Sequence, residues 1–313
     1  MIEVEELTKR YGDTVAVDGL SFRVGPGHVT GFLGPNGAGK STTMRSLLGL
    51  DRPTSGRALI DGRPYRDIPR PLCSVGALLD ARGLHGSRTA YGHLLGLARS
   101  NRIPRARVRE VIGMTGLDDA ADKRTGGFSL GMAQRLGVAA SLLGDPPVLL
   151  LDEPVNGLDP EGILWIRGLM KRLAAEGRTV FVSSHLMSEM ALTAEHLIVI
   201  GRGRLLADTD VETFIARNSR SYIRIRTPER ERMRDVLATA GVMTGEGPDG
   251  TLEASGVSLE TVGELIAGNG VVVHEVSPQT ASLEEAFMRL TADAVEFRAD
   301  SGTPAPLAEE ESR

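Results

Sequence analysis

Short apolar runs alternate with helical patterns over residues 29 to about 208. Two of these runs, residues 148–151 (Val-Leu-Leu-Leu) and 180–182 (Val-Phe-Val), are continuous but too short for helices. Runs of this kind suit strands that are buried on both faces of a sheet. Because they alternate with helical segments, the pattern predicts an α/β fold with a parallel sheet covered by helices. Short strands and turns are expected before this region, where residues 2–7 and 20–24 alternate between apolar and polar side chains.

The pattern changes near residue 215, where a second region begins. Residues 222–226 (Tyr-Ile-Arg-Ile-Arg) alternate as expected for a strand with one buried face. The order β-α-β-β-α-β predicts a small ferredoxin-like α+β module, which a last helix completes. The elements predicted after the first strand are a helix over 229–240, strands over 241–244 and 251–254, a helix over 258–267, a strand over 271–276 and a helix over 283–290.

These patterns divide the chain into three parts. Residues 1–215 are expected to form an α/β unit, and residues 216–292 a small α+β accessory domain. Residues 293–313 are rich in proline, serine and glutamate, so this tail is predicted to be disordered.

Composition places the chain among ordinary globular proteins, with 41% hydrophobic and 25% charged residues in a length of 313. No apolar run approaches the ~18 residues of a membrane-spanning helix, and no signal segment is recognisable at the start. The single cysteine, Cys73, excludes an intramolecular disulfide and fits a reducing compartment. A net charge of −5 argues against a general nucleic-acid binder, since such proteins are usually basic. We therefore expect a cytosolic protein without a nucleic-acid partner.

Residues 34–42 match the phosphate-binding pattern G-x-x-x-x-G-K-[ST] between a predicted strand and a predicted helix. Glycines let backbone N–H groups turn toward phosphate oxygens, and the helix that starts at Lys40 directs its positive end at them. Lys40 would reach the β- and γ-phosphates, and Ser41 would ligate Mg²⁺. A glycine-rich turn before a helix is the simpler alternative, but the flanking pattern favours binding of ATP or GTP. The residues expected to bind the nucleotide are Gly34, Pro35, Asn36, Gly37, Ala38, Gly39, Lys40, Ser41 and Thr42.

A second candidate motif is the acidic pair Asp152-Glu153 at the end of the predicted strand 148–151. A carboxylate at the carboxyl end of a buried strand beside a phosphate loop suits Mg²⁺, so Asp152 is the expected metal-side residue. Glu153 can then face the γ-phosphate, where it would orient or deprotonate a water. Alone, the pair could be a capped turn, but beside a phosphate loop it indicates hydrolysis of the nucleotide.

Residues 127–135 (Gly-Phe-Ser-Leu-Gly-Met-Ala-Gln-Arg) precede a helical pattern. Ser129 is a good N-cap, and the neighbouring glycine leaves the helix start accessible to an anion. A capped helix with no further role is the simplest interpretation of this segment alone.

These motifs occur in one order with two others, Asn-Gly-Leu-Asp-Pro at residues 156–160 and Ser-Ser-His at residues 183–185. Over about residues 1–215 the sequence resembles the ATP-binding cassette of ABC transporters, specifically the ATPase subunits of bacterial multidrug- or antibiotic-resistance exporters. The resemblance implies a P-loop NTPase fold of the ABC type. That fold has a mixed sheet, an antiparallel β subdomain and a helical subdomain, here at about residues 80–145.

The resemblance also implies roles for several residues. Tyr11, otherwise a turn tyrosine, would stack on adenine. His185, which alone would be taken as structural, would touch the γ-phosphate as a neutral donor and act with Glu153 in catalysis. Asp159 would lie in the loop that joins two ATP sites. The signature loop, which contacts the γ-phosphate bound by the other subunit, would contain Ser129, Leu130, Gly131 and Met132.

Two positions depart from the pattern of that family. Asp80 stands where a glutamine is usual, after the predicted strand over residues 75–79. A carboxylate can still ligate Mg²⁺ or hold a water, but it only accepts hydrogen bonds where glutamine also donates. Leu130 and Met132 replace a glycine and a glutamine, while Ser129 and Gly131 are retained.

By this resemblance the chain is an ATPase that powers a separate integral-membrane permease from the cytoplasmic side of the cell membrane. Two copies would close head-to-tail on two ATP molecules with Mg²⁺, and the helical subdomain would contact the permease. Two other classes remain: a soluble ABC ATPase acting on ribosomes or DNA, and a nucleotide-sensing regulatory module. The single cassette, the absence of heptad repeats and the net charge of −5 weigh against the first of these.

Overall fold

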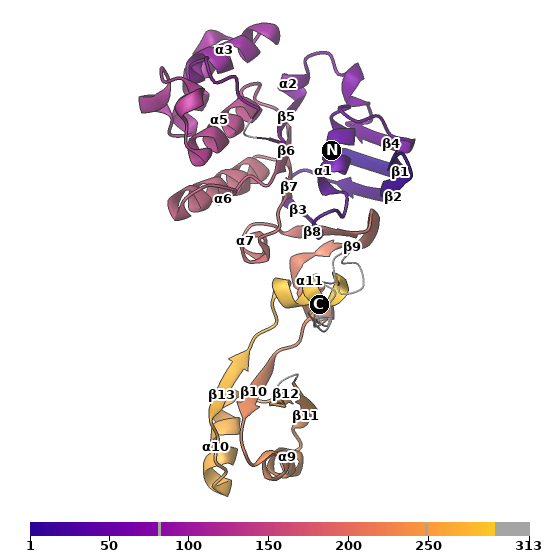
Figure 1. Ribbon diagram of the computed structural model, residues 1–313, viewed down its shortest axis with the longest axis vertical. Coiled ribbons are helices and arrows are strands. Elements are labelled where there is room, and N and C mark those ends of the chain that lie inside the picture. Colours follow the sequence, from indigo (N-terminus) through magenta and orange to yellow (C-terminus); the bar gives the residue numbers. More distant parts are fainter. Residues whose placement is uncertain (81–82, 248–249, 292–313) are drawn as a thin grey trace, which may run out of the picture.

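The computed structural model describes residues 1–80, 83–247 and 250–291 (Figure 1). The tail predicted to be disordered, residues 293–313, lies outside the described residues. The described chain forms a large part, which includes the N-terminus, and a smaller part joined to it by two connecting segments (Figure 1).

A mixed sheet of six strands lies at the centre of the large part, as far as the chain is described, in the order β5-β6-β7-β3-β8-β9. Its first five strands are parallel, and β9 runs antiparallel to β8. Every residue of β7 and residues 148–151 of β6 are buried, which confirms the prediction of strands covered on both faces. The strands are β3 (Val29–Leu33), β5 (Val75–Leu78), β6 (Val148–Asp152), β7 (Thr179–Ser183), β8 (His196–Gly201) and β9 (Arg204–Asp210).

An antiparallel sheet of strand order β2-β1-β4 packs on one side of the central sheet. Helix α1 (Lys40–Leu47) lies beside it in Figure 1, and the three elements β1 (Ile2–Tyr11), β2 (Thr14–Val24) and β4 (Ser55–Ile60) share a core with α1 and the central sheet. The rings of Phe22 and Phe32 lie 5.6 Å apart at the centre of this core. The antiparallel β subdomain is therefore as the family resemblance implied.

Helices cover the other side of the central sheet, where α6 (Pro160–Ala175) and the short α7 (Met187–Ala191) lie (Figure 1). The helical subdomain stands beyond β5 and β6 and contains α3 (Ala90–Ser100), α4 (Arg105–Met114) and α5 (Leu130–Leu142). Short helices lie at Tyr65–Asp67, Pro71–Ser74 (α2), Asp118–Ala120 and Thr125–Gly127. These parts give the fold predicted for an ABC cassette.

The smaller part contains a four-stranded antiparallel sheet, in the described residues, of order β11-β12-β10-β13. Its core joins Ile223 and Ile225 to Met233 of one helix and Val262 of the other, so both helices pack on the same sheet face. The elements are β10 (Tyr222–Arg226), α9 (Arg230–Thr239), β11 (Met243–Glu246), β12 (Leu252–Ser255), α10 (Leu259–Asn269) and β13 (Glu275–Gln279). The order of elements is the predicted β-α-β-β-α-β.

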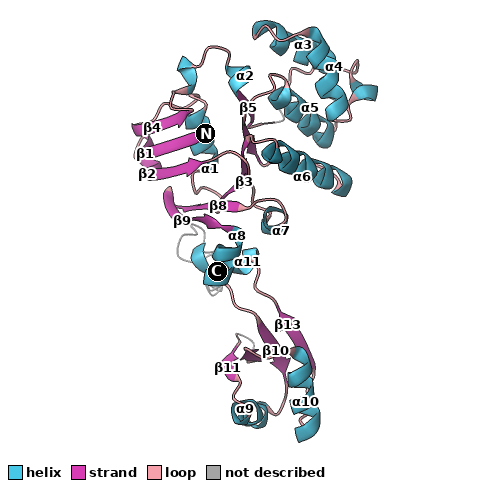
Figure 2. Cartoon of the chain, turned by 180° about the vertical axis from the view of Figure 1, so that it is seen from behind, coloured by secondary structure: helices cyan, strands magenta, loops and turns pink. Residues whose placement is uncertain are grey.

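Two predictions for this region need correction. The strand predicted over 271–276 lies instead at Glu275–Gln279, because Val271 follows the left-handed Gly270 cap of α10 and packs into the small core before the strand begins. The predicted helix 283–290 is present as α11 (Leu283–Thr291), but it does not complete the small module. It packs on α8 (Val211–Asn218) in the large part, where its residue Phe287 shares a core with Phe214 (Figure 2).

The division of the chain at residue 215 into two domains stays a prediction. Among the helices in the described ranges, none combines the length and the apolar character needed to cross a bilayer.

Candidate active site

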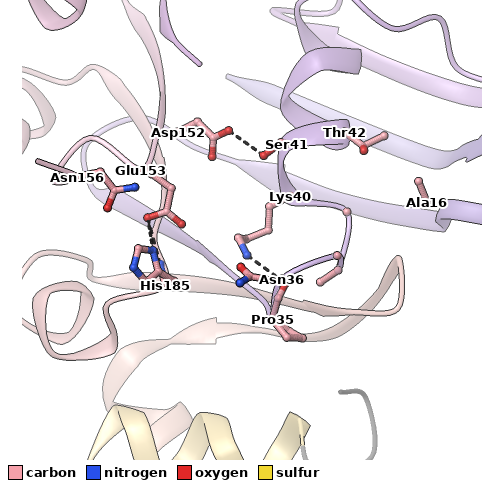
Figure 3. Close-up of a pocket in the computed structure, with 13 residues that line it drawn as sticks. Ala16, Pro35, Asn36, Lys40, Ser41, Thr42, Asp152, Glu153, Asn156 and His185 are labelled. Carbon is pink, nitrogen blue, oxygen red and sulfur yellow. Dashed lines mark hydrogen bonds and ion pairs between the residues drawn. The ribbon is translucent and has the colours of Figure 1, made fainter. Parts of the chain in front are cut away.

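The predicted phosphate loop connects β3 to α1 and forms one wall of a cavity of about 590 Å³ (Figure 3). Its backbone is tightly held: Gly39 has φ 103°, and a Cβ on it would lie 2.5 Å from the carbonyl oxygen of Ala16. A residue other than glycine would therefore be excluded at this turn. The cavity is lined by Ala16, Pro35, Asn36, Gly37, Ala38, Gly39, Lys40, Ser41, Thr42, Asp152, Glu153, Asn156 and His185. All predicted nucleotide residues except Gly34 and Tyr11 thus line one cavity.

Lys40 is buried at the base of this cavity, with 8% of its surface exposed. Its Nζ donates to the carbonyl oxygens of Gly34, at 2.5 Å, and Pro35, at 3.2 Å. Burial lowers the pKa of Lys40, and the negative charges of Glu153 and Asp152 partly oppose this effect. A triphosphate at the same place would add negative charge and raise the pKa again.

This coupling gives a pH-dependent prediction. Because phosphate raises the depressed pKa of Lys40, ATP binding should be accompanied by proton uptake that grows as the pH rises from neutral toward about 10. Affinity should fall over the same range. Calorimetry in buffers of different ionisation enthalpy measures this uptake, and Lys40→Met should remove it. If proton uptake on ATP binding is the same in Lys40→Met as in the wild type, another group takes up the proton.

Ser41 and Asp152 meet across the cavity, where Ser41 Oγ donates to Asp152 Oδ2 at 2.9 Å. Ser183, at the end of β7, also donates to Asp152 through its hydroxyl. No cluster of three or more His, Cys, Asp or Glu side chains suited to a metal occurs in the part of the chain that the structure describes. One carboxylate and one hydroxyl nevertheless fit Mg²⁺, which is held in nucleotide sites by few protein oxygens together with phosphates.

Glu153 follows Asp152 and lies against His185 (Figure 3). Its Oε2 is 2.7 Å from Nδ1 of His185. An ionised carboxylate only accepts hydrogen bonds, so a neutral His185 ring carries its proton on Nδ1 in this arrangement. The other ring nitrogen is then an acceptor. Donation from a neutral His185 to a γ-phosphate, as the family resemblance implies, therefore requires the ring to turn away from Glu153.

The signature residues lie outside the phosphate cavity of their own chain. Ser129 caps α5, and its Oγ accepts a hydrogen bond from the backbone N–H of Met132 at 3.2 Å. Gly131 lies so close to the loop after β6 that a Cβ on it would be 2.9 Å from the carbonyl oxygen of Gly157. Leu130 is 41% exposed. The structure thus places the signature loop beside the cavity rather than in it.

Asp80 and Asp159 have different surroundings. A second cavity of about 600 Å³ brings Asp80 together with Leu130, Gln134, Asp152 and Glu153. Asp80 is therefore near the acidic pair but does not line the phosphate cavity. Asp159 is the N-cap of α6, and its Oδ1 accepts from the N–H of Gly162 at 2.8 Å.

Tyr11 stands at the end of β1 beside Thr42 of the phosphate cavity; it does not line that cavity itself and is 47% exposed. Its hydroxyl donates to Asp51 Oδ2 at 2.7 Å, and this hydrogen bond is the largest cause that raises the pKa of Tyr11. Lys9 Nζ lies 4.7 Å from the centre of the ring. Asp51 is also held by Arg45 at 2.7 Å, so the ring is anchored at its hydroxyl end.

Several residues of the site carried no individual role in the sequence analysis. Ala16 approaches the phosphate loop only because β2 folds over it, and no motif marks it. Asn156 belongs to a quoted motif but had no assigned chemistry, and it lines both cavities. Gln134 is one of two polar residues buried in α5, the other being Ser141, and burial of its amide is the signal that could have singled it out.

Three protein-family models match parts of the sequence. A family model described as ABC transporter matches residues 17–156. A model described as AAA domain, putative AbiEii toxin, Type IV TA system, matches residues 124–191, and a domain of unknown function matches residues 221–284.

Two curated relatives extend the similarity over most of the chain. The bacitracin transport ATP-binding protein BcrA of Enterococcus faecalis is 35% identical over 297 residues, covering 93% of this chain and 96% of BcrA. The Nod factor export ATP-binding protein I of Burkholderia pseudomallei (strain 1710b) is 35% identical over 305 residues, covering 93% of this chain and 96% of that protein.

Solved structures agree with this similarity. The dimeric structure of MJ0796, a bacterial ABC transporter cassette, has a TM-score of 0.62 and 25% identity, covering 67% of this chain and 99% of that one. A further ATP-binding subunit of an ABC transporter has a TM-score of 0.64 and 25% identity, covering 69% of this chain and 92% of its own. The chain belongs to the ATP-binding proteins of ABC transporters. It is an ATPase of that family, with ATP as its substrate.

Proposed function

We propose that the chain is the ATP-hydrolysing subunit of an exporter, and that it powers a separate integral-membrane permease. The name of Nod factor export ATP-binding protein I supports an export role, and that of BcrA supports a role in transport. The protein would act at the cytoplasmic side of the membrane as a peripheral subunit, contacting the permease through the helical subdomain with α3 and α4.

Two copies form a head-to-tail dimer with two composite ATP sites in this proposal. The observation that carries it is the separation within one chain of the phosphate cavity from Ser129 and Gly131. A signature loop that contacts γ-phosphate must then come from a second copy. The dimeric MJ0796 cassette has a similar fold and supports the same arrangement.

Within each site, the phosphate loop binds the triphosphate, and Lys40 leaves the carbonyl oxygens of Gly34 and Pro35 for the β- and γ-phosphates. Ser41 and Asp152 would hold Mg²⁺, which when bound neutralises charge on the phosphate oxygens. Asp80, from the neighbouring cavity, would hold a further water or ligand of that ion.

Hydrolysis depends on Glu153, which would orient the attacking water and accept its proton. His185 holds the carboxylate of Glu153 before ATP binds, and its ring then turns to donate a hydrogen bond to the γ-phosphate. Asp159 caps α6 at the loop between the two sites. Loss of the phosphate then removes the charge that joins the signature loop of one copy to the site of the other, and the dimer opens.

The class of partner is tested by purifying the tagged full chain from membranes. We expect a multi-spanning permease to copurify and to change the ATPase rate of the chain. Recovery of ribosomes or DNA without a membrane protein would instead identify a soluble ABC ATPase. ATP binding with negligible turnover in both fractions would identify a nucleotide-sensing module.

Tyr11 would stack on adenine, since its ring is exposed while its hydroxyl is fixed to Asp51. Base–aromatic stacking contributes about 1–3 kcal/mol, so Tyr11→Ala should weaken ATP binding by about 5- to 150-fold. Tyr11→Phe keeps the ring and should bind nearly as the wild type does. Fluorescent-nucleotide titration measures both variants, and unchanged affinity of Tyr11→Ala would remove the tyrosine from the adenine site.

A further inference from the structure

Glu153 has a strained backbone that is held by hydrogen bonds on both sides. Its φ is 50°, in the left-handed region that residues other than glycine rarely adopt. Its N–H donates to Ser183 Oγ at 3.0 Å, and its carbonyl oxygen accepts from Nε2 of Gln134 at 3.1 Å. The backbone of Glu153 is therefore held from β7 and from α5, while its carboxylate contacts His185.

Gln134 supplies the α5 contact from a buried position, with 4% of its surface exposed. A buried amide is costly unless it is hydrogen-bonded, so this residue is poorly explained by packing alone. It also lines the second cavity, together with Glu153 and Asp80. Gln134 thus shares one cavity with the acidic pair and with Asp80.

Helix α5 contacts neighbouring elements at further points, in the nucleotide-binding core and at the end of α4. Its first turn touches the loop after β6, as the closeness of Gly131 to Gly157 indicates. One turn further along, the guanidinium of Arg135 lies 4.6 Å from the centre of the Trp165 ring in α6 and donates to the carbonyl oxygen of Thr115 at 3.2 Å. A displacement of α5 would therefore pull on the backbone of Glu153 through the Gln134 amide.

We propose that Gln134 is a positioning residue: it holds Glu153 in the orientation that serves hydrolysis and links the Ser129 end of α5 to the carboxylate of the same subunit. The inference rests on the role proposed above for Glu153. Ser129 of one copy contacts the nucleotide bound by its partner. Through Gln134, that contact adjusts the orientation of Glu153 in the first copy. Each site then responds to the occupancy of the other.

The test replaces Gln134 with methionine, which has a similar volume and no N–H donor. Because a small displacement of a catalytic group costs up to about 100-fold in rate, we expect Gln134→Met to lower kcat by about 10- to 100-fold. ATP affinity and KM should stay within about twofold of the wild type, since the phosphate loop is untouched. Steady-state ATPase of the full chain, together with its copurifying permease, gives both values.

A matched control separates positioning from a general loss of stability. Ser141 lies on the same helix, is 1% exposed, and donates to the carbonyl oxygen of Val138 at 2.8 Å without touching Glu153. Ser141→Ala should lower thermal stability comparably and leave kcat unchanged per folded molecule. A second variant, Gln134→Glu, adds a pH readout, because a protonated carboxyl can donate to the Glu153 carbonyl oxygen and an ionised one cannot.

Burial raises the pKa of a carboxyl group, so the rate of Gln134→Glu relative to wild type should recover as the pH falls from about 8 to about 6. The inference is overturned by a wild-type kcat in Gln134→Met, by a loss of affinity with kcat unchanged, or by equal rate losses in Gln134→Met and Ser141→Ala. A rate of Gln134→Glu, relative to wild type, that does not change with pH also contradicts the inference. If Glu153→Gln itself retains full activity, the proposed function fails instead, so the two failures are distinguishable.

Discussion

Replacement of Glu153 by glutamine is expected to lower ATP turnover by about 100- to 10,000-fold, the usual cost of losing a general base. Glutamine has the same shape but does not accept a proton, so the water near the γ-phosphate is no longer activated. The ATP affinity should stay within about threefold of the wild type, because the contacts that bind ATP before the reaction come from the phosphate loop. Measurement of single-turnover hydrolysis and of nucleotide affinity on the same preparation tests both halves of this expectation.

The same variant should accumulate as a dimer in the presence of ATP, since hydrolysis is what releases the two copies. Size-exclusion chromatography with light scattering measures the dimer. Adding Ser129→Arg to Glu153→Gln provides the control, because residue 129 lies outside the phosphate cavity of its own chain. The double variant should still bind ATP yet remain monomeric. A dimer in the double variant, or an unaltered ATPase rate in Glu153→Gln, would contradict the composite-site arrangement.

Replacement of Lys40 by methionine should weaken ATP binding by about 10- to 150-fold, because a hydrogen bond to a charged group contributes about 1.5–3 kcal/mol. Methionine has a similar length but no charge. Lys40 is buried and places its ammonium group in the phosphate cavity. Turnover should fall further than binding, since the charge on the γ-phosphate grows during transfer.

The matched control for Lys40 is Lys171, an exposed residue of α6. Lys171→Met removes the same charge from the chain and should leave both binding and hydrolysis unchanged. Isothermal titration with ATP and Mg²⁺ gives the affinity of each variant. Equal affinities in Lys40→Met and the wild type would remove the ammonium group from phosphate recognition.

The sequence was sufficient for the parts of the site that follow one another along the chain. The phosphate loop needs glycines at fixed positions before a helix, and Lys40, Ser41 and Asp152 come together because the carboxyl ends of β3 and β6 lie at one edge of the sheet. Continuous apolar runs likewise identified β6 and β7, since a strand covered on both faces has no polar side.

Contacts between distant segments could not be obtained in this way. Ala16 reaches the phosphate loop only through the fold of the antiparallel sheet, and the pairing of His185 with Glu153 depends on side-chain rotation. The strand predicted over 271–276 was displaced because its apolar residues serve the small core before they reach the sheet. Helix α11 has the expected length, yet periodicity does not say which core its apolar face will join.

The return of α11 to α8 makes the small module an insertion rather than an appendage. The two connecting segments are bonded to each other: the N–H of Ser282 donates to Ser219 Oγ at 3.2 Å, and that of Ala281 to Ser221 Oγ at 3.0 Å. Truncation before residue 283 would strip α11 from the cassette and leave Phe214 uncovered. A shortened ATPase is better made by removing the small module and joining Ser219 to Ser282 through a short linker. This keeps α11 packed on α8.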